Sequence, residues 1–191
     1  MPDRITAALT RRRLGGAVLL LAGIVVAAIV LWPGGGNDGR AGKPLPVRIV
    51  SVPPLGLGFV HPRNWKRTVS GEVIRLTSPD GTLILLFSSP FNRPGTGFAK
   101  AEAKSALLKR FRPAKVVRDG RSPLGRAGRV QSFELTGERD DRLVRALVHV
   151  ASSHWRTYVV TMLTGENPSR RRLAEARRIL STVNFSKPRK I

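Results

Sequence analysis

Residues 73–88 read VIRLTSPDGTLILLFS, and this stretch decides the fold. Two runs that favour β-structure, at 73–77 and 82–88, flank the sequence SPDG, and Asp80-Gly81 is a pair typical of a hairpin turn. Residues 83–87 are apolar at every position, which is typical of a central strand covered on both faces. The stretch therefore predicts a β-hairpin in the interior of a sheet.

The residues after this hairpin predict two helices and three further strands. Residues 98–111 are rich in helix-forming residues, with apolar side chains at helical spacing. Strands are expected at 129–135, 143–151 and 156–163, joined by GERDDR and SSH. A closing helix is expected at 168–183, with Asn167 as N-cap and Pro168 as its first residue. This order predicts an α+β fold, an antiparallel sheet with helices packed on its faces.

The N-terminal part of the chain has a different character. Residues 14–32 carry no charge and are long enough to span the ~30 Å core of a bilayer. Arg4, Arg11, Arg12 and Arg13 precede this run, so residues 1–13 are expected in the cytoplasm. A cleaved signal peptide is the alternative, although its apolar region is usually only ~7–15 residues and ends in a small-residue site, which is absent here.

After the anchor, the Gly- and Pro-rich residues 33–54 predict a flexible linker, in which VRIVSV could form a first edge strand. The folded domain is expected at 55–186, followed by a basic tail at 187–191.

Composition limits the possible functions. Lys and Arg outnumber Asp and Glu by 34 to 12, which gives a net charge of +22 and attraction to polyanions. The chain contains no cysteine, which excludes disulfides, thiolate metal sites, a cysteine nucleophile and an acylated cysteine anchor.

The order of motifs over residues 56–186 resembles the PsbP-like, or Mog/PsbP/LpqN-like, family. The resemblance rests on a small set of apolar and turn residues: Phe59, Pro62, Trp65, the turn at 78–81, a Gly-rich strand with Gly125 and Gly128, Tyr158, Leu180, Val183 and Phe185. It implies an α/β/α sandwich that works as an accessory or adaptor domain, located in the cell envelope in actinobacterial members. The chain lacks the lipid-bearing cysteine of the LpqN type and has an apolar N-terminal segment instead.

The same resemblance gives an interpretation of GFVHPRNWKR at 58–67. It implies that Trp65 packs over the core and that Pro62 fixes the turn at the start of the sheet. His61 is then a structural or solvent-facing residue, and the run is a folding signature.

No residue pattern predicts catalysis. His149 falls in an expected strand and His154 in the turn after it, and neither belongs to a metal-ligand spacing. The sequence has no G-x-S-x-G motif, and the acidic pair Asp140-Asp141 lies at a hairpin tip. We therefore expect a non-enzymatic protein without metal or cofactor, and keep an envelope hydrolase or transferase using His149 and His154 as the alternative.

The expected partners are an envelope protein, anionic lipid or wall polymer. A candidate anion-binding patch lies on the closing helix and comprises Arg170, Arg171, Arg172, Arg177 and Arg178, extended by Lys187, Arg189 and Lys190. The alternative is an ordinary solvated face. Extracytoplasmic nucleic-acid binding is a second alternative, which the charge favours but no nucleic-acid-binding motif accompanies.

Overall fold

The computed structural model describes residues 46–91 and 95–189 of the chain. The large sheet contains β3 (Lys66–Ser70), β4 (Val73–Thr77), β5 (Leu83–Phe91), β6 (Ala114–Pro123), β7 (Arg129–Arg139), β8 (Arg142–Ser152) and β9 (Thr157–Thr164). The small sheet contains β1 (Val47–Val52), β2 (Leu57–Pro62) and β10 (Asn184–Phe185). The helices are α2 (Thr96–Arg110), α3 (Arg170–Ser181) and the short 3₁₀ helices η1 (Pro53–Leu55) and η2 (Gly125–Ala127).

The large sheet is antiparallel and has the strand order β3-β4-β5-β9-β8-β7-β6. The predicted hairpin is β4–β5, in which Thr77 pairs with Ile84 and Val73 with Ser88. Strand β5 lies between β4 and β9, and its residues Leu83, Ile84 and Leu85 are fully buried. The prediction of a covered interior hairpin is confirmed.

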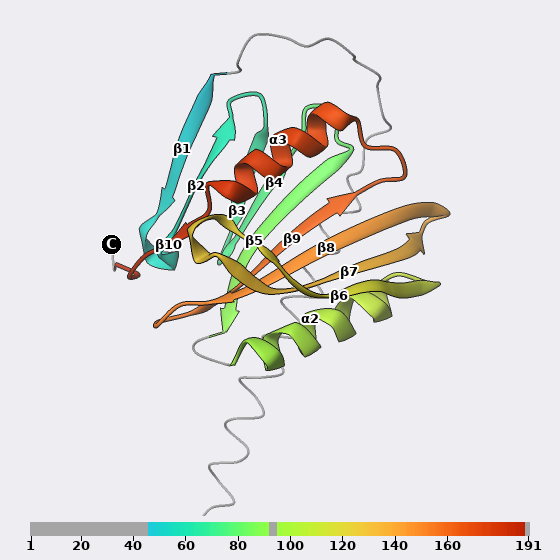
Figure 1. Cartoon of the computed structure of the whole chain (residues 1–191). Coiled ribbons are helices and arrows are strands. Elements are labelled where there is room, and N and C mark those ends of the chain that lie inside the picture. The colour runs from blue at the N-terminus through green and yellow to red at the C-terminus, as the bar shows by residue number, and fades with distance from the viewer. Residues whose placement is uncertain (1–45, 92–94, 190–191) are drawn as a thin grey trace, which may run out of the picture.

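Helices cover both faces of this sheet, as Figure 1 shows. On one face, Val144, Ala146 and Val148 of β8 belong to the same buried cluster as Leu107 of α2. On the other face, α3 and the small sheet form the covering layer around a second cluster. The predicted α+β fold with helices on the faces of an antiparallel sheet is confirmed, and the small sheet is an addition to it.

The first edge strand suggested for VRIVSV forms as β1, so the folded part begins within the range 33–54 expected as linker. Strand β1 lies inside the range predicted as linker, and it pairs along its whole length with β2, from Val47–Pro62 to Val52–Leu57. The expected tail 1–13 and anchor 14–32, and the linker up to residue 45, lie outside the described residues. Within residues 46–91 and 95–189, no helix is long and apolar enough to cross a membrane.

The closing helix starts two residues later than predicted. Ser169, not Asn167, is the N-cap, and its side chain accepts a hydrogen bond from the backbone N–H of Arg172 at 3.2 Å. Pro168 therefore precedes the cap instead of occupying the first helical position. Helix α2 starts two residues earlier than the predicted 98.

The expected Gly-rich strand at 125–128 is in fact η2 and its following turn. Gly125 has a φ of +49°, and a Cβ atom at this position would lie 1.9 Å from the carbonyl oxygen of Val183. Glycine is required here because the backbone passes directly over the chain that leaves α3.

The GFVHPRNWKR run is part of the core, as the resemblance implied. Trp65 is buried, and its backbone N–H donates to the carbonyl of Pro62 at 3.1 Å, which closes the turn after β2. His61 is also buried, and its Nδ1 lies 2.8 Å from the carbonyl oxygen of Pro62. Burial lowers the pKa of His61, so the ring is neutral and has a structural role.

Candidate ligand-binding cavity

A cavity of about 680 Å³ lies between α3 and the part of the large sheet formed by β6, β7, β8 and β9. It exists because α3 packs on β2, β5 and η2, and so leaves the same face of β7 and β8 without a helix above it. Ligand-binding pockets commonly measure about 300–1,000 Å³. We call this feature the α3 cavity.

The α3 cavity has apolar walls on two sides. Leu147 of β8 and Met162 of β9 lie on the sheet side, and Leu173 and Leu180 lie on the α3 side. Leu143, also on β8, lines the cavity with 42% of its surface exposed. These side chains provide a surface for an apolar group that enters from solvent.

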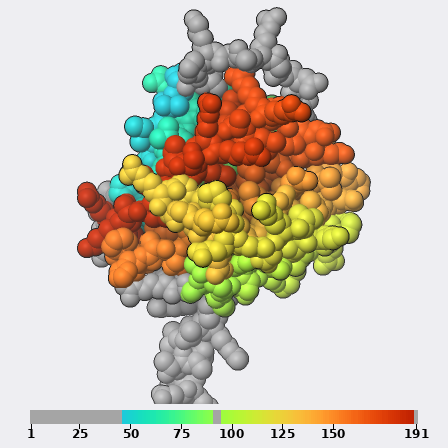
Figure 2. All heavy atoms as spheres, in the orientation of Figure 1, coloured from blue at the N-terminus to red at the C-terminus, as the bar shows by residue number. Residues whose placement is uncertain are grey.

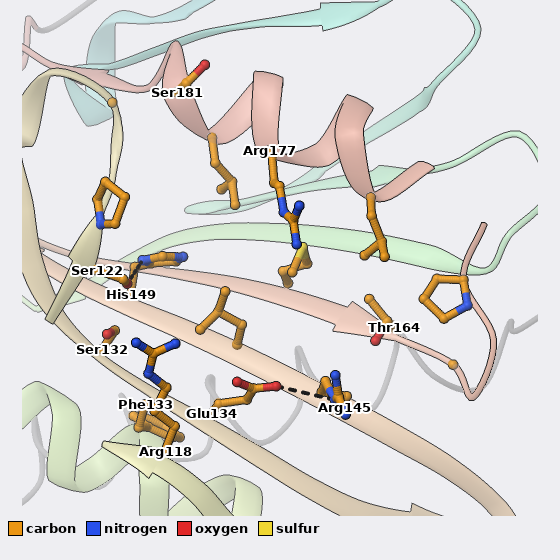
Figure 3. Close-up of a pocket in the computed structure, with 18 of the residues that line it drawn as sticks. Arg118, Ser122, Ser132, Phe133, Glu134, Arg145, His149, Thr164, Arg177 and Ser181 are labelled. Atoms are coloured by element: carbon orange, nitrogen blue, oxygen red, sulfur yellow. Dashed lines mark hydrogen bonds and ion pairs between the residues drawn. The ribbon is translucent and has the colours of Figure 1, made fainter. Parts of the chain in front are cut away.

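His149 of β8 forms one end of this surface. The residue is 2% exposed, and its Nδ1 lies 2.9 Å from the hydroxyl oxygen of Ser122 at the end of β6 (Figure 3). Its Nε2 is buried and has no hydrogen-bond partner among the described residues. Burial lowers the pKa of His149 to about 4, so the imidazole is neutral at physiological pH.

Charged side chains surround the cavity. Arg118 comes from β6, Arg145 from β8 and Arg177 from α3, while Glu134 of β7 and Glu166 carry negative charge. Arg145 forms an ion pair with Glu134, with 3.3 Å between Nε and Oε1.

Arg118 and Arg177 are exposed, and neither forms an ion pair or hydrogen bond with the part of the chain that the structure describes. Figure 3 shows Arg177 extending from α3 toward the sheet and Arg118 on the other side of the cavity. In Figure 2, α3 (red) and the segment around η2 (yellow) meet on the face of the molecule that carries this opening.

The five arginines of the predicted anion patch do not form a single surface. Arg170 and Arg178 are exposed, and Arg177 lines the α3 cavity. Arg171 donates to Glu175 at 3.1 Å. Of the expected extension, Lys187 and Arg189 are exposed, and Lys190 lies outside the described residues.

Arg172 forms ion pairs with two carboxylates inside the domain. Its Nε lies 3.1 Å from Asp80 Oδ2 and its Nη1 lies 2.9 Å from Glu175 Oε2. Glu175 also accepts a 2.9 Å hydrogen bond from Nε1 of Trp65. Arg172, Asp80 and Glu175 each expose only 12–14% of their side chains, so this guanidinium is not available to an external anion.

The network holds both carboxylates in their ionised form. Burial is the largest single effect on Asp80 and raises its pKa, but hydrogen bonds from Ser78, Thr82 and Arg172 together outweigh it and lower the pKa. For Glu175, burial is again the largest effect, and hydrogen bonds from Trp65 and Arg172 outweigh it. The turn of the β4–β5 hairpin is thereby tied to α3.

The other candidate catalytic residues, His154, Asp140 and Asp141, do not line the α3 cavity. His154 is exposed in the turn between β8 and β9 and contacts the ring of Trp155. Asp140 and Asp141 form the two-residue turn between β7 and β8, with φ angles of +51° and +58°. No group of three His, Asp or Glu side chains within residues 46–91 and 95–189 is placed to hold a metal ion.

The sequence analysis did not identify the α3 cavity. Arg118 and Ser122 belong to β6, which was not predicted at all, and Glu134 and Arg145 lie on strands interpreted only as core. One signal was available in β8. Its even positions are Val144, Ala146, Val148 and Val150, whereas its odd positions 143–149 read Leu, Arg, Leu, His. Such a mixed face indicates a strand surface that is only partly covered.

No family model matches the chain, and no curated protein matches it. Among solved structures, cyanobacterial PsbP (CyanoP) from Synechocystis is similar with a TM-score of 0.50 and 14% identity, covering 79% of this chain and 98% of that one. A protein from Bacteroides thetaiotaomicron has a TM-score of 0.50 and 13% identity over 73% of this chain. LpqN from Mycobacterium tuberculosis has a TM-score of 0.43 and 13% identity over 76% of this chain and 87% of LpqN.

This chain spans 48% of the Bacteroides protein, about half its length. The similarity to CyanoP extends over nearly the whole of that protein and establishes a PsbP-like fold. The expectation of this fold is confirmed.

Proposed function

We propose that the protein is a binding or accessory module of the cell envelope, without catalytic activity. In this proposal, residues 14–32 hold the chain in the membrane, the basic domain lies outside the cytoplasm, and the α3 cavity is its binding site. The observation that carries the proposal is the cavity itself. It combines apolar walls with Arg118, Arg177 and the buried Nε2 of His149, none of which has a partner among the described residues. A concave apolar surface with a few convergent polar groups is typical of a ligand site.

The membrane part of the proposal rests on sequence. The uncharged segment 14–32 with arginines before it favours an orientation with residues 33–191 outside the cytoplasm. The PsbP-like fold is compatible with this arrangement, since the described domain begins at β1, after the segment proposed as anchor.

One contact supports a hydrolase as the second candidate. The hydroxyl oxygen of Ser122 lies 2.9 Å from Nδ1 of His149 inside the α3 cavity, which is the distance between a nucleophile and its base. However, neither nitrogen of His149 contacts a carboxylate, and a pKa of about 4 makes the imidazole a weak base at neutral pH. For this reason we favour binding over hydrolysis.

Site-specific photo-crosslinking tests the binding role. We would place p-benzoylphenylalanine in the full chain at Leu143, which lines the cavity and is 42% exposed. The matched control is Val117 of β6, which is 48% exposed and does not line it. Irradiation of intact cells is expected to give a defined adduct at position 143 and none at 117. Equal adducts at both positions, or none at either, would contradict the proposal.

A probe that reacts with active serine nucleophiles distinguishes the hydrolase from the binding module. Fluorophosphonate labelling that disappears in the Ser122→Ala variant would make the protein a serine hydrolase. We expect no labelling of the full chain.

A further inference from the structure

We propose that the α3 cavity binds an apolar molecule that carries a single anionic group, a carboxylate or a phosphate monoester. The anionic group lies between Arg118 and Arg177, and the apolar body lies against Leu147, Met162 and Leu173. This inference rests on the proposed binding role and specifies its ligand.

The charges that line the cavity favour a ligand with one anionic group. Three arginines and two glutamates line it, and Arg145 and Glu134 neutralise one another through their ion pair. Arg118, Arg177 and Glu166 remain, which leaves one excess positive charge. Guanidinium groups bind carboxylate and phosphate oxygens through paired hydrogen bonds, so two arginines facing one opening suit such a group.

The two glutamates also select against a polyanion. Glu134 lies beside the sheet side of the cavity and Glu166 in the segment before α3. A chain of phosphates or a nucleic acid would place further negative charges close to these carboxylates. A ligand with one anionic group avoids that repulsion, because its charge needs only the space between Arg118 and Arg177.

His149 supplies a further polar contact. Its Nε2 is buried without a partner, and buried polar groups in proteins are usually hydrogen-bonded. If the Ser122 hydroxyl donates to Nδ1, Nε2 carries the proton and can donate to a ligand oxygen. Figure 3 shows the ring in the cavity wall, with the sheet residues beside it.

The apolar walls fit the body of the ligand. Leu147 and Met162 project from neighbouring strands, and Leu173 faces them from α3. Met162 is unbranched and adapts to ligands of varied shape. A fully polar anion would leave this surface without a partner, so we expect the apolar and anionic parts to be required together.

Photoaffinity labelling in membranes tests the ligand class. The full chain in its native membrane would be irradiated with diazirine-labelled dodecanoic acid, and labelled positions would be mapped by mass spectrometry. We expect label on the residues of β8, β9 and α3 that line the cavity, such as Leu147, Met162 and Leu173, with competition by unlabelled dodecanoate or dodecyl phosphate and not by dodecanol. The stronger of the two anionic competitors identifies whether the preferred group is a carboxylate or a phosphate.

The double variant Arg118→Ala/Arg177→Ala is expected to reduce labelling about tenfold, as the loss of charge-assisted hydrogen bonds predicts. The control Arg126→Ala/Arg178→Ala removes the same charge from exposed arginines outside the cavity and should leave labelling unchanged. Equal competition by dodecanol, equal loss in both double variants, or label outside the cavity would overturn the inference. In each of these cases a position-143 adduct in the crosslinking experiment would leave the broader binding role standing.

Discussion

The Nε of Arg172 lies 3.1 Å from Oδ2 of Asp80, and this ion pair joins α3 to the turn of a hairpin 92 residues earlier in the chain. Asp80 also accepts hydrogen bonds from Ser78 and Thr82, so one carboxylate organises its own turn and receives the helix. The arginine that a sequence reading assigns to anion binding is therefore a structural residue.

Replacing Arg172 should destabilise the domain. Arg172→Gln leaves Asp80 and Glu175 without their cation in a site where 12–14% of each side chain is exposed. We expect the free energy of unfolding to fall by about 2–4 kcal/mol in chemical denaturation. Arg170→Gln is the matched control, since Arg170 is exposed in the first turn of α3 and should change stability by less than about 0.5 kcal/mol. Equal effects of the two substitutions would contradict the network.

Trp65 combines an apolar and a polar contribution that two substitutions can separate. Trp65→Ala removes a ring that is 3% exposed and should cost about 3–5 kcal/mol. Trp65→Phe keeps most of the ring but loses the hydrogen bond to Glu175, and should cost about 1–2 kcal/mol more than Trp155→Phe on the surface. Thermal or urea unfolding provides the measurement. A neutral Trp65→Phe variant would show that the hydrogen bond contributes nothing.

His149 should make stability depend on pH. Burial lowers its pKa from an ordinary 6.5 to about 4, so between these values the unfolded chain binds a proton that the folded chain does not. Stability should therefore fall as the pH drops through this range, by up to about 3 kcal/mol from this group.

The His149→Gln variant removes this proton linkage. Its stability should fall less than that of the wild type between about pH 7 and pH 4, as measured by urea unfolding at each pH. The remaining dependence belongs to other groups such as His61, whose pKa is lowered in the same direction. Parallel pH profiles for wild type and variant would place His149 in a solvated environment.

Two glycines with positive φ angles should respond differently to alanine. Gly125 and Gly128 have φ angles of +49° and +69°, but only at Gly125 would a Cβ atom meet the chain, at 1.9 Å from Val183. Gly128 has a ψ of −141°, which with its positive φ is a region essentially restricted to glycine, so Gly128→Ala should cost about 1–3 kcal/mol from backbone strain alone. Gly125→Ala should cost clearly more in the same unfolding assay. Similar losses would mean that the approach of η2 to Val183 relaxes freely.

The membrane topology can be tested with protease. If residues 14–32 are a retained anchor with the domain outside, protease added to intact spheroplasts should remove the domain and leave a membrane-bound N-terminal fragment. Recovery of a soluble protein that begins near residue 33 would instead identify the segment as a cleaved signal peptide.

The parts of the fold that could be predicted are those with buried patterns. Elements that contact the core carry recognisable apolar patterns: a continuous run where both faces are buried and a periodic one where a single face is buried. This holds for the β4–β5 hairpin, α2 and the strands β7 to β9. Strand β3 is exposed at every position, and β6 is exposed at seven of its ten. Backbone hydrogen bonds to β4 and β7 hold β3 and β6 in the sheet. Backbone bonds do not require apolar side chains, so the sequence pattern does not reveal these two strands.

The α3 cavity could not be predicted for a related reason. Its polar residues come from β6, β8 and α3, and they converge only because α3 covers one half of the sheet. His154 is an exposed residue of the turn after β8, where the sequence analysis placed it. His149 was interpreted as a hydrogen-bonded residue inside the fold, and it is buried, but only its Nδ1 is bonded and its Nε2 has no partner among the described residues. The sequence analysis named His149 and Arg177 but not Arg118 and Arg145, which line the same cavity.

Strand β10 has a consequence for how the chain reaches its native state. Asn184 and Phe185 pair with Gly58 and Leu57, so the small sheet unites the beginning and the end of the domain. The chain after it continues this union, since the backbone N–H of Arg189 donates to the carbonyl of Pro53. Such pairing between distant segments raises contact order and slows folding. The nascent domain therefore cannot complete its topology until residues 184–189 have left the ribosome, and a stop codon before residue 184 would release a chain whose first strands lack their final partner.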